Sequence, residues 1–188
     1  MNSRTRNEAI QQAQEYLAKK PVYLDTETTG LDPMAEILEI SIVDHDGNIL
    51  VNTLVKPRGK IDPGASRVHG ITEEMLAEAQ GWDVVWPQVD TALNGRYVGI
   101  YNLDFDVRMM QQSHQRNWMQ WGQPQIDFFC IMNLYAQFYG QWNSRHGNYR
   151  WQSLDNARRQ CGLNLPNTHR AFDDTLLARA VLQYMAAQ

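Results

Sequence analysis

The chain of 188 residues has few cysteines and no long apolar run. Its two cysteines, Cys130 and Cys161, are too few for a disulfide framework, and neither belongs to a C-x-x-C pair typical of zinc or redox sites. No apolar stretch is long enough to cross a bilayer, and the polar residues 1–7 lack the apolar segment of a secretory signal. We therefore expect a cytoplasmic protein with small, buried cysteines.

The chain also lacks an excess of positive charge. Its 17 lysines and arginines face 21 aspartates and glutamates, which gives a formal net charge of −4. This balance argues against a protein that coats nucleic acid by bulk positive charge. It does not exclude nucleic-acid binding, because a metal site built from four acids would account for a charge of this size before the cations bind.

The hydrophobic pattern predicts a single α/β domain with one mixed five-stranded sheet flanked by helices. Residues 46–48 indicate a hairpin turn between the second and third strands, and residues 57–71 are expected to form a loop. Thr72 could cap a following helix. The expected strands lie at 21–26, 37–44, 49–55, 97–101 and 125–129. The expected helices lie at 4–19, 82–94, 103–116, 130–139, 153–161 and 170–186.

Two carboxylates, Asp25 and Glu27, end the first apolar run. Positions i and i+2 of a strand point to the same face, and like charges beside a core are costly unless a cation lies between them. Such pairs also occur on solvated edge strands. Here the turn signals Gly30 and Pro33 follow, which would place the pair at a strand end. The segment therefore predicts half of a divalent-cation site.

Two further aspartates are expected to point inward from helices. In the last predicted helix the apolar side chains share a face centred on Asp174, whereas Asp173 lies about 100° away and should be a solvated or capping acid. In the helix after the fourth strand, Asp106 shares the apolar face and Asp104 falls nearly opposite. Each inward acid could alone be a hydrogen-bonded core residue, but with the strand pair they predict a four-carboxylate site.

His169 lies five residues before Asp174. On one continuous helix the two side chains would be about 140° apart and could not converge. We therefore expect His169 in the loop that leads into the helix, beside the same site, although a lone histidine is more often a surface or core residue.

Three segments of the chain resemble the three motifs of the DEDDh 3′–5′ exonucleases, the family that includes the proofreading subunit of bacterial DNA polymerase III and ribonuclease T. The segments are Asp25 to Gly30, Asn102 to Asp106 and His169 to Asp174, and Val68 to Thr72 also matches the family. The resemblance covers about residues 21–186 and implies a ribonuclease H-like fold. It makes residues 21–188 the exonuclease domain and residues 1–20 an N-terminal helical extension.

The resemblance implies that Asp25, Glu27, Asp106 and Asp174 bind two divalent cations, Mg²⁺ or Mn²⁺, and that His169 is the general base. The reaction would release nucleoside 5′-monophosphates one at a time from a 3′ end. It also implies contacts between the terminal nucleotide and four residues, which are Thr28, Leu31, His69 and Phe105. The second motif departs from the family, because Tyr101-Asn102 replaces the common His-Asn, but the metal ligand is kept.

Several alternatives remain open at this level. Single-stranded DNA is the expected substrate, yet RNA would undergo the same chemistry at phosphorus, and a non-catalytic binding module is a third reading. Proofreading, DNA repair and RNA processing would all fit. The N-terminal helix could bind a partner protein, form a homodimer or pack on its own domain. The aromatic and basic segment 139–151, which includes Arg145 and Arg150, could grip a strand or pack on the domain.

Overall fold

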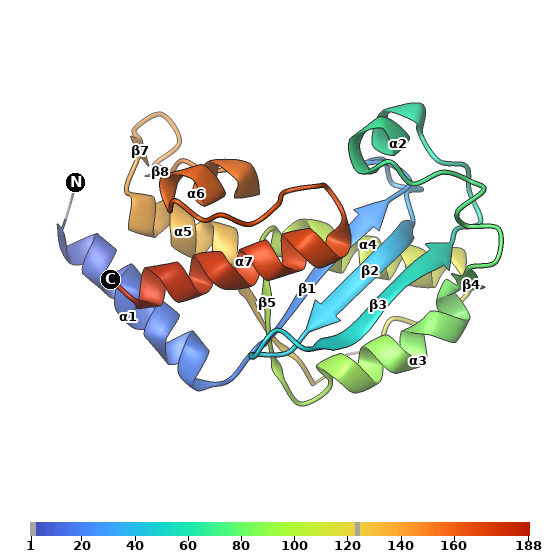
Figure 1. The fold of residues 1–188 in the computed structure, drawn as a ribbon, viewed down its shortest axis with the longest axis horizontal. Coiled ribbons are helices and arrows are strands. Elements are labelled where there is room, and N and C mark those ends of the chain that lie inside the picture. The colour runs from blue at the N-terminus through green and yellow to red at the C-terminus, as the bar shows by residue number, and fades with distance from the viewer. Residues whose placement is uncertain (1–2, 123–124) are drawn as a thin grey trace.

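A mixed six-stranded sheet in the order β4-β3-β2-β1-β5-β6 forms the centre of the computed structural model, which describes residues 3–122 and 125–188 (Figure 1). β1, β2 and β3 form an antiparallel meander, whereas β5 and β6 continue the sheet in parallel with β1. The strands are β1 (Val22–Thr28), β2 (Ile37–Val43), β3 (Ile49–Lys56), β4 (Gln80–Gly81), β5 (Tyr97–Ile100) and β6 (Asp127–Cys130), with a separate pair, β7 (Trp142–Asn143) and β8 (Asn148–Tyr149).

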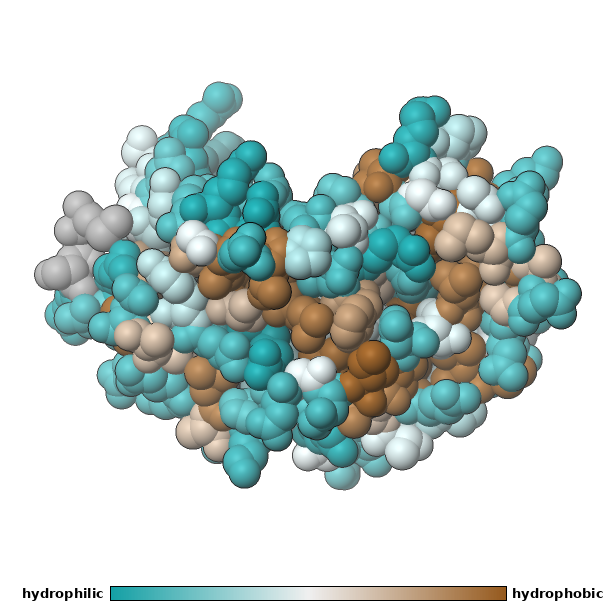
Figure 2. Space-filling view, viewed as in Figure 1, coloured by the Kyte–Doolittle hydropathy of each residue, from teal (hydrophilic) through white to brown (hydrophobic). Residues whose placement is uncertain are grey.

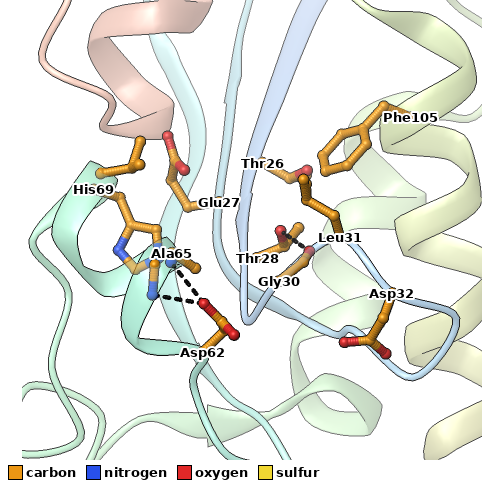
Figure 3. Close-up of a pocket in the computed structure, with 12 residues that line it drawn as sticks. Thr26, Glu27, Thr28, Gly30, Leu31, Asp32, Asp62, Ala65, His69 and Phe105 are labelled. Carbon is orange, nitrogen blue, oxygen red and sulfur yellow. Dashed lines mark hydrogen bonds between the residues drawn. The ribbon is translucent and has the colours of Figure 1, made fainter.

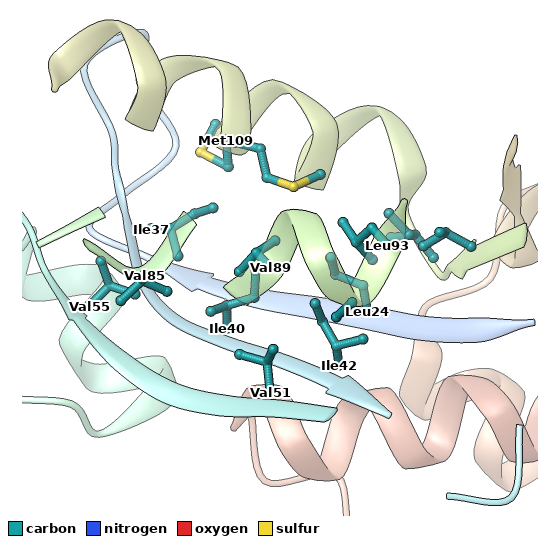
Figure 4. Close-up of a cluster of buried hydrophobic side chains, with 14 of the residues drawn as sticks. Leu24, Ile37, Ile40, Ile42, Val51, Val55, Val85, Val89, Leu93 and Met109 are labelled. Carbon is teal, nitrogen blue, oxygen red and sulfur yellow. The ribbon is translucent and has the colours of Figure 1, made fainter. Parts of the chain in front are cut away.

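Helices cover both faces of this sheet. They are α1 (Ser3–Ala18), α2 (Pro63–His69), α3 (Trp82–Leu93), α4 (Leu103–Arg116), α5 (Ile131–Tyr139), α6 (Leu154–Gln160) and α7 (Ala171–Ala186). α3 and α4 pack over one face, where Leu24, Ile40, Val89 and Met109 belong to one buried cluster (Figure 4). α1, α5 and α7 pack over the other face around Tyr23. β1 therefore sends alternate side chains to two different cores.

The predicted α/β architecture is confirmed, but the sheet has six strands instead of the predicted five. The additional strand, β4, is only two residues long and pairs in parallel with the end of β3. Two residues carry too little alternation to give a strand pattern. β6 also begins two residues later than the strand predicted at 125–129.

The prediction that residues 57–71 form a loop is wrong, because this range contains α2. Asp62 caps the helix through a hydrogen bond that Oδ1 accepts from Gly64 N (2.6 Å), Pro63 occupies the first turn, and Gly70 ends the helix at φ 71°. These are standard start and stop signals of a helix. The helix predicted after Thr72 is also wrong, since residues 73–78 form turns.

The N-terminal helix α1 packs on its own chain. Ala9 and Ala13 are fully buried against α5 and α7, and the ring of Tyr16 stacks on Phe129 with the centroids 4.0 Å apart. The apolar face of α1 is thus covered by its own chain. Binding of a partner protein, or of a second copy of this chain, to the outward face of α1 stays a prediction. Among the described helices, none combines the length and apolar character needed to cross a membrane.

Candidate active site

Carboxylates gather where β1 meets the first turn of α7. Asp25 and Glu27 share the face of β1 on which Tyr23 lies, and this face is covered by α7. Asp174 lies in the first turn of α7 and is 7% exposed. One oxygen each of Asp25, Glu27 and Asp174 lies within 4.8 Å of the others. These three side chains can therefore coordinate one ion together.

Asp106 approaches the same place from α4. It lies in the first turn of that helix, is 3% exposed and accepts a hydrogen bond of 2.7 Å from Thr26 Oγ1. Asp104, two residues earlier, is exposed. Asp106 lines one acidic cleft of about 330 Å³ together with Asp25, Glu27 and Asp174. The structure thus brings together the four carboxylates that the sequence selected.

Burial raises the pKa of all four acids, and repulsion from the other carboxylates adds to this at Asp25 and Glu27. Burial is the largest cause at each residue, and it raises the pKa of Glu27 to about 8 and that of Asp174 to about 6. The pKa of Asp25 is raised well above its ordinary value by burial and by the nearby charge of Asp106, and burial also raises the pKa of Asp106. At neutral pH, a cluster of four such carboxylates must either retain protons or bind a cation. All of these donors are oxygen atoms, which suit a hard divalent cation.

His169 lies in the loop before α7, as the sequence predicts. Its Nδ1 is 4.0 Å from Asp174 Oδ2, and its side chain is half-exposed at the cleft. Its backbone adopts a positive φ of 52°, a conformation that costs a residue with a Cβ about 1–2 kcal/mol. Thr168 Oγ1 donates a hydrogen bond to Asp173 Oδ2, so that Asp173 stabilises this loop instead of facing the acidic cluster.

Glu39 is a residue that the sequence analysis missed. It lies in β2 directly opposite Glu27, and its buried carboxylate accepts hydrogen bonds from Arg170 Nε (3.0 Å) and from Ala171 N (2.9 Å). These bonds hold the beginning of α7, which carries Asp174, and the residue after His169. The available signal was an acid inside the apolar run of β2, in which every neighbouring side chain is buried.

A second pocket of about 500 Å³ adjoins the acidic cleft and shares Thr26, Glu27 and Phe105 with it. This pocket is lined by all four residues predicted to contact the substrate: Thr28, Leu31, His69 and Phe105. Figure 3 shows Leu31 and Phe105 on one side and His69 on the other. An apolar pocket therefore opens directly beside the carboxylates.

His69 lines this pocket as a neutral imidazole. Its Nδ1 accepts a hydrogen bond of 3.0 Å from Ile71 N, which places the proton of the neutral ring on Nε2. Burial lowers the pKa of His69 and favours this neutral form. Nε2 is buried, and the backbone of Thr28 lies near enough to favour the protonated ring.

Comparison with known proteins relates most of this chain to exonucleases. Residues 22–182 match the exonuclease family represented by RNase T. An uncharacterized exonuclease, CP81 of Escherichia phage 186, is 33% identical over 183 residues, which cover 94% of this chain and 93% of that protein. A PolC-type DNA polymerase III of Thermotoga maritima is 32% identical over 85% of this chain, but the match spans only 11% of the polymerase.

Solved structures share the fold. Exonuclease X in complex with 5′-overhanging duplex DNA superposes with a TM-score of 0.63 at 24% identity, over 89% of this chain and 92% of that one. An Escherichia coli exonuclease I complex with single-stranded DNA gives a TM-score of 0.68 at 18% identity, over 85% of this chain and 38% of that one. These likenesses confirm the ribonuclease H-like arrangement predicted from the motifs.

Proposed function

The chain belongs to the RNase T exonuclease family, and from this membership we propose that it removes nucleotides one at a time from the 3′ end of single-stranded DNA, releasing nucleoside 5′-monophosphates. The observation that carries the proposal is the convergence of four carboxylates, of which Asp106 and Asp174 are buried, and His169 on one cleft, beside a pocket of about 500 Å³. Exonuclease X and exonuclease I bind DNA in their solved complexes, which supports DNA as the substrate.

Asp25, Glu27, Asp106 and Asp174 would hold two divalent cations, Mg²⁺ or Mn²⁺, which when bound stabilise the negative charge that develops on the reacting phosphate. His169 would accept a proton from the attacking water as that oxygen bonds to phosphorus and the bond to the leaving 3′ oxygen breaks. Its half-exposed ring can reach a water molecule, and Asp174, 4.0 Å away, stabilises the imidazolium that results. General-base assistance typically accelerates such a step about 10²–10⁴-fold.

The adjoining pocket would hold the terminal nucleotide. Leu31 and Phe105 offer apolar contact to a base without selecting its identity. His69, which lines the same pocket, would contact the sugar of that nucleotide. Thr28 donates a hydrogen bond to Gly30 O (2.8 Å), which shapes the turn that presents Leu31.

Matched single-stranded DNA and RNA, digested side by side with Mg²⁺ or Mn²⁺, test the substrate. We expect 5′-mononucleotides from DNA, their loss in Asp106→Ala, and retained activity in Asp104→Ala, which removes an exposed acid from the same helix. Digestion of RNA alone would move the substrate assignment to RNA. The absence of mononucleotides from both strands in the unsubstituted protein would contradict the proposed activity.

A further inference from the structure

The segment between α5 and α6 forms an arm, residues 141–151, built on the β7/β8 pair. Trp142 and Trp151 are 55% and 66% exposed, so the alternative in which both pack into the domain does not hold. The rings of Trp142 and Tyr149 contact each other edge to face, with the centroids 5.1 Å apart. The arm thus presents two large aromatic rings to solvent within one short segment, an arrangement that suits stacking on bases.

The arm is also a local region of positive charge in an acidic chain. Residues 128–154 contain none of the 21 aspartates and glutamates of the sequence. Arg145 and His146 lie at the exposed tip, and Arg150 is exposed after β8. Cations interleaved with exposed aromatic rings suit a chain of phosphates and bases.

The base of the arm is fixed next to the acidic cleft. Arg150 N donates a hydrogen bond to Gln141 O (2.8 Å), and Tyr101 Oη donates one to the carbonyl of the buried Gln152 (3.0 Å). Tyr101 also lines the acidic cleft. The arm is therefore held in a defined position relative to the carboxylates.

An open groove of about 660 Å³ follows the arm, lined by Tyr149, Arg150 and Trp151 among others. Ser153 lines the acidic cleft, only two residues after Trp151, a separation that a chain spans in at most about 7 Å. Groove and cleft are thus neighbours. Figure 2 shows the surface hollowed between two raised ends, which correspond in Figure 1 to the arm with α6 and to α2.

The order of these sites gives the strand a direction. The pocket for the terminal nucleotide is lined by residues of α2, including Ala65 and His69, whereas the opposite side of the acidic cleft is lined by Leu154 of α6. With the terminal nucleotide in that pocket, nucleotides 5′ of the reacting phosphate would extend toward α6. This side leads to the arm.

We propose that the arm binds the single strand on the 5′ side of the reacting phosphate, with phosphates on Arg145 and Arg150 and bases stacked on Trp142 and Trp151. The inference rests on the proposed 3′–5′ exonuclease activity, because that activity sets the polarity of the strand. The arm would increase affinity for strands long enough to reach it and would have no effect on the bond-breaking step.

The test compares a dinucleotide, which is too short to reach the arm, with a longer single strand of DNA or RNA. In Arg145→Ala/Arg150→Ala we expect unchanged dinucleotide hydrolysis, a higher KM for the longer strand, and a slope of log Kd against log salt that is lower by about 1.4, at about 0.7 per phosphate contact. Arg4→Ala/Arg96→Ala is the control, because it removes two exposed arginines that lie outside both pockets and the groove.

The aromatic part has its own variants. Trp151→Ala should weaken binding of the longer strand about tenfold, and Trp151→Phe should retain most of the affinity because a ring remains. An unchanged slope of log Kd against log salt in Arg145→Ala/Arg150→Ala would overturn the proposed role of the arm. So would a variant that raises KM equally for the dinucleotide and for the longer strand. Failure of the unsubstituted protein to cleave any substrate would instead count against the proposed activity, since strand binding and its salt slope are measured separately.

Discussion

Replacing Glu39 by alanine should loosen the beginning of α7 and slow catalysis without removing any proposed metal ligand. Ala171 N, which is fully buried, would lose its acceptor, and an unsatisfied buried donor costs about 1–3 kcal/mol. Arg170 would lose its ion pair, but its side chain is 38% exposed, so water can replace the carboxylate and the loss is about 0–1 kcal/mol.

Relief of repulsion offsets part of this cost, because the charge of Glu39 helps to raise the pKa of Glu27 and Asp174. A net destabilisation of about 2 kcal/mol follows, which for a chain of this length lowers Tm by about 4–8 °C. The turnover number should fall at least about tenfold, since His169 and Asp174 lie on the segment that Glu39 holds and part of the general-base contribution would be lost.

Thermal unfolding followed by circular dichroism and the turnover number on a single-stranded oligonucleotide measure the two effects. Glu39→Gln is the matched variant, because its amide oxygen can still accept the hydrogen bond from Ala171 N while the charge is lost. Its Tm should therefore lie between those of the unsubstituted protein and Glu39→Ala. Unchanged Tm and turnover in Glu39→Ala would refute the idea that this carboxylate holds the segment.

Three further predictions follow from the site. His169→Ala should lower the turnover number about 10²–10⁴-fold while Mn²⁺ affinity, measured by calorimetry, stays within a few-fold; equal losses in both would assign the residue to metal binding instead. Asp106→Ala should reduce Mn²⁺ affinity, and Asp104→Ala should leave it unchanged in the same titration. In metal-free protein, the folded pKa of Glu27 (about 8) and Asp174 (about 6) exceeds the unfolded values of about 4.3 and 3.9. The folded state then binds more protons than the unfolded state, so the Tm of the metal-free protein should fall as pH rises from about 4 to 8. Mg²⁺ should raise Tm more at pH 8 than at pH 6. A Tm of the metal-free protein that rises across this pH range would contradict the raised pKa values of Glu27 and Asp174.

The parts of the site that the sequence predicted are those with a periodic signal. The spacing of apolar residues along each helix was sufficient to distinguish the buried Asp106 from the exposed Asp104, and Asp174 from its neighbour. α2 was missed although Asp62, Pro63 and Gly70 provide its caps, because a helix of seven residues carries hardly two turns of periodicity.

Glu39 was missed for a different reason. Its role depends on Arg170 and Ala171, which lie 131 and 132 residues later in the chain, and no local pattern reports such a pair. The composition of the arm was visible in the sequence, but only the structure shows that Trp142 and Trp151 are exposed and do not pack on the domain. Strand binding by the arm stays a proposal.

The proposed 3′–5′ exonuclease activity can be measured by product analysis on single-stranded DNA labelled at its 5′ end, with Mg²⁺ or Mn²⁺ present and with EDTA in their place. We expect a ladder of 5′-labelled strands that shorten one nucleotide at a time, release of nucleoside 5′-monophosphates, and no reaction in EDTA or with Asp106→Ala. Release of the labelled 5′ nucleotide first, products that end in a 3′-phosphate, or full activity in EDTA would contradict the proposed activity.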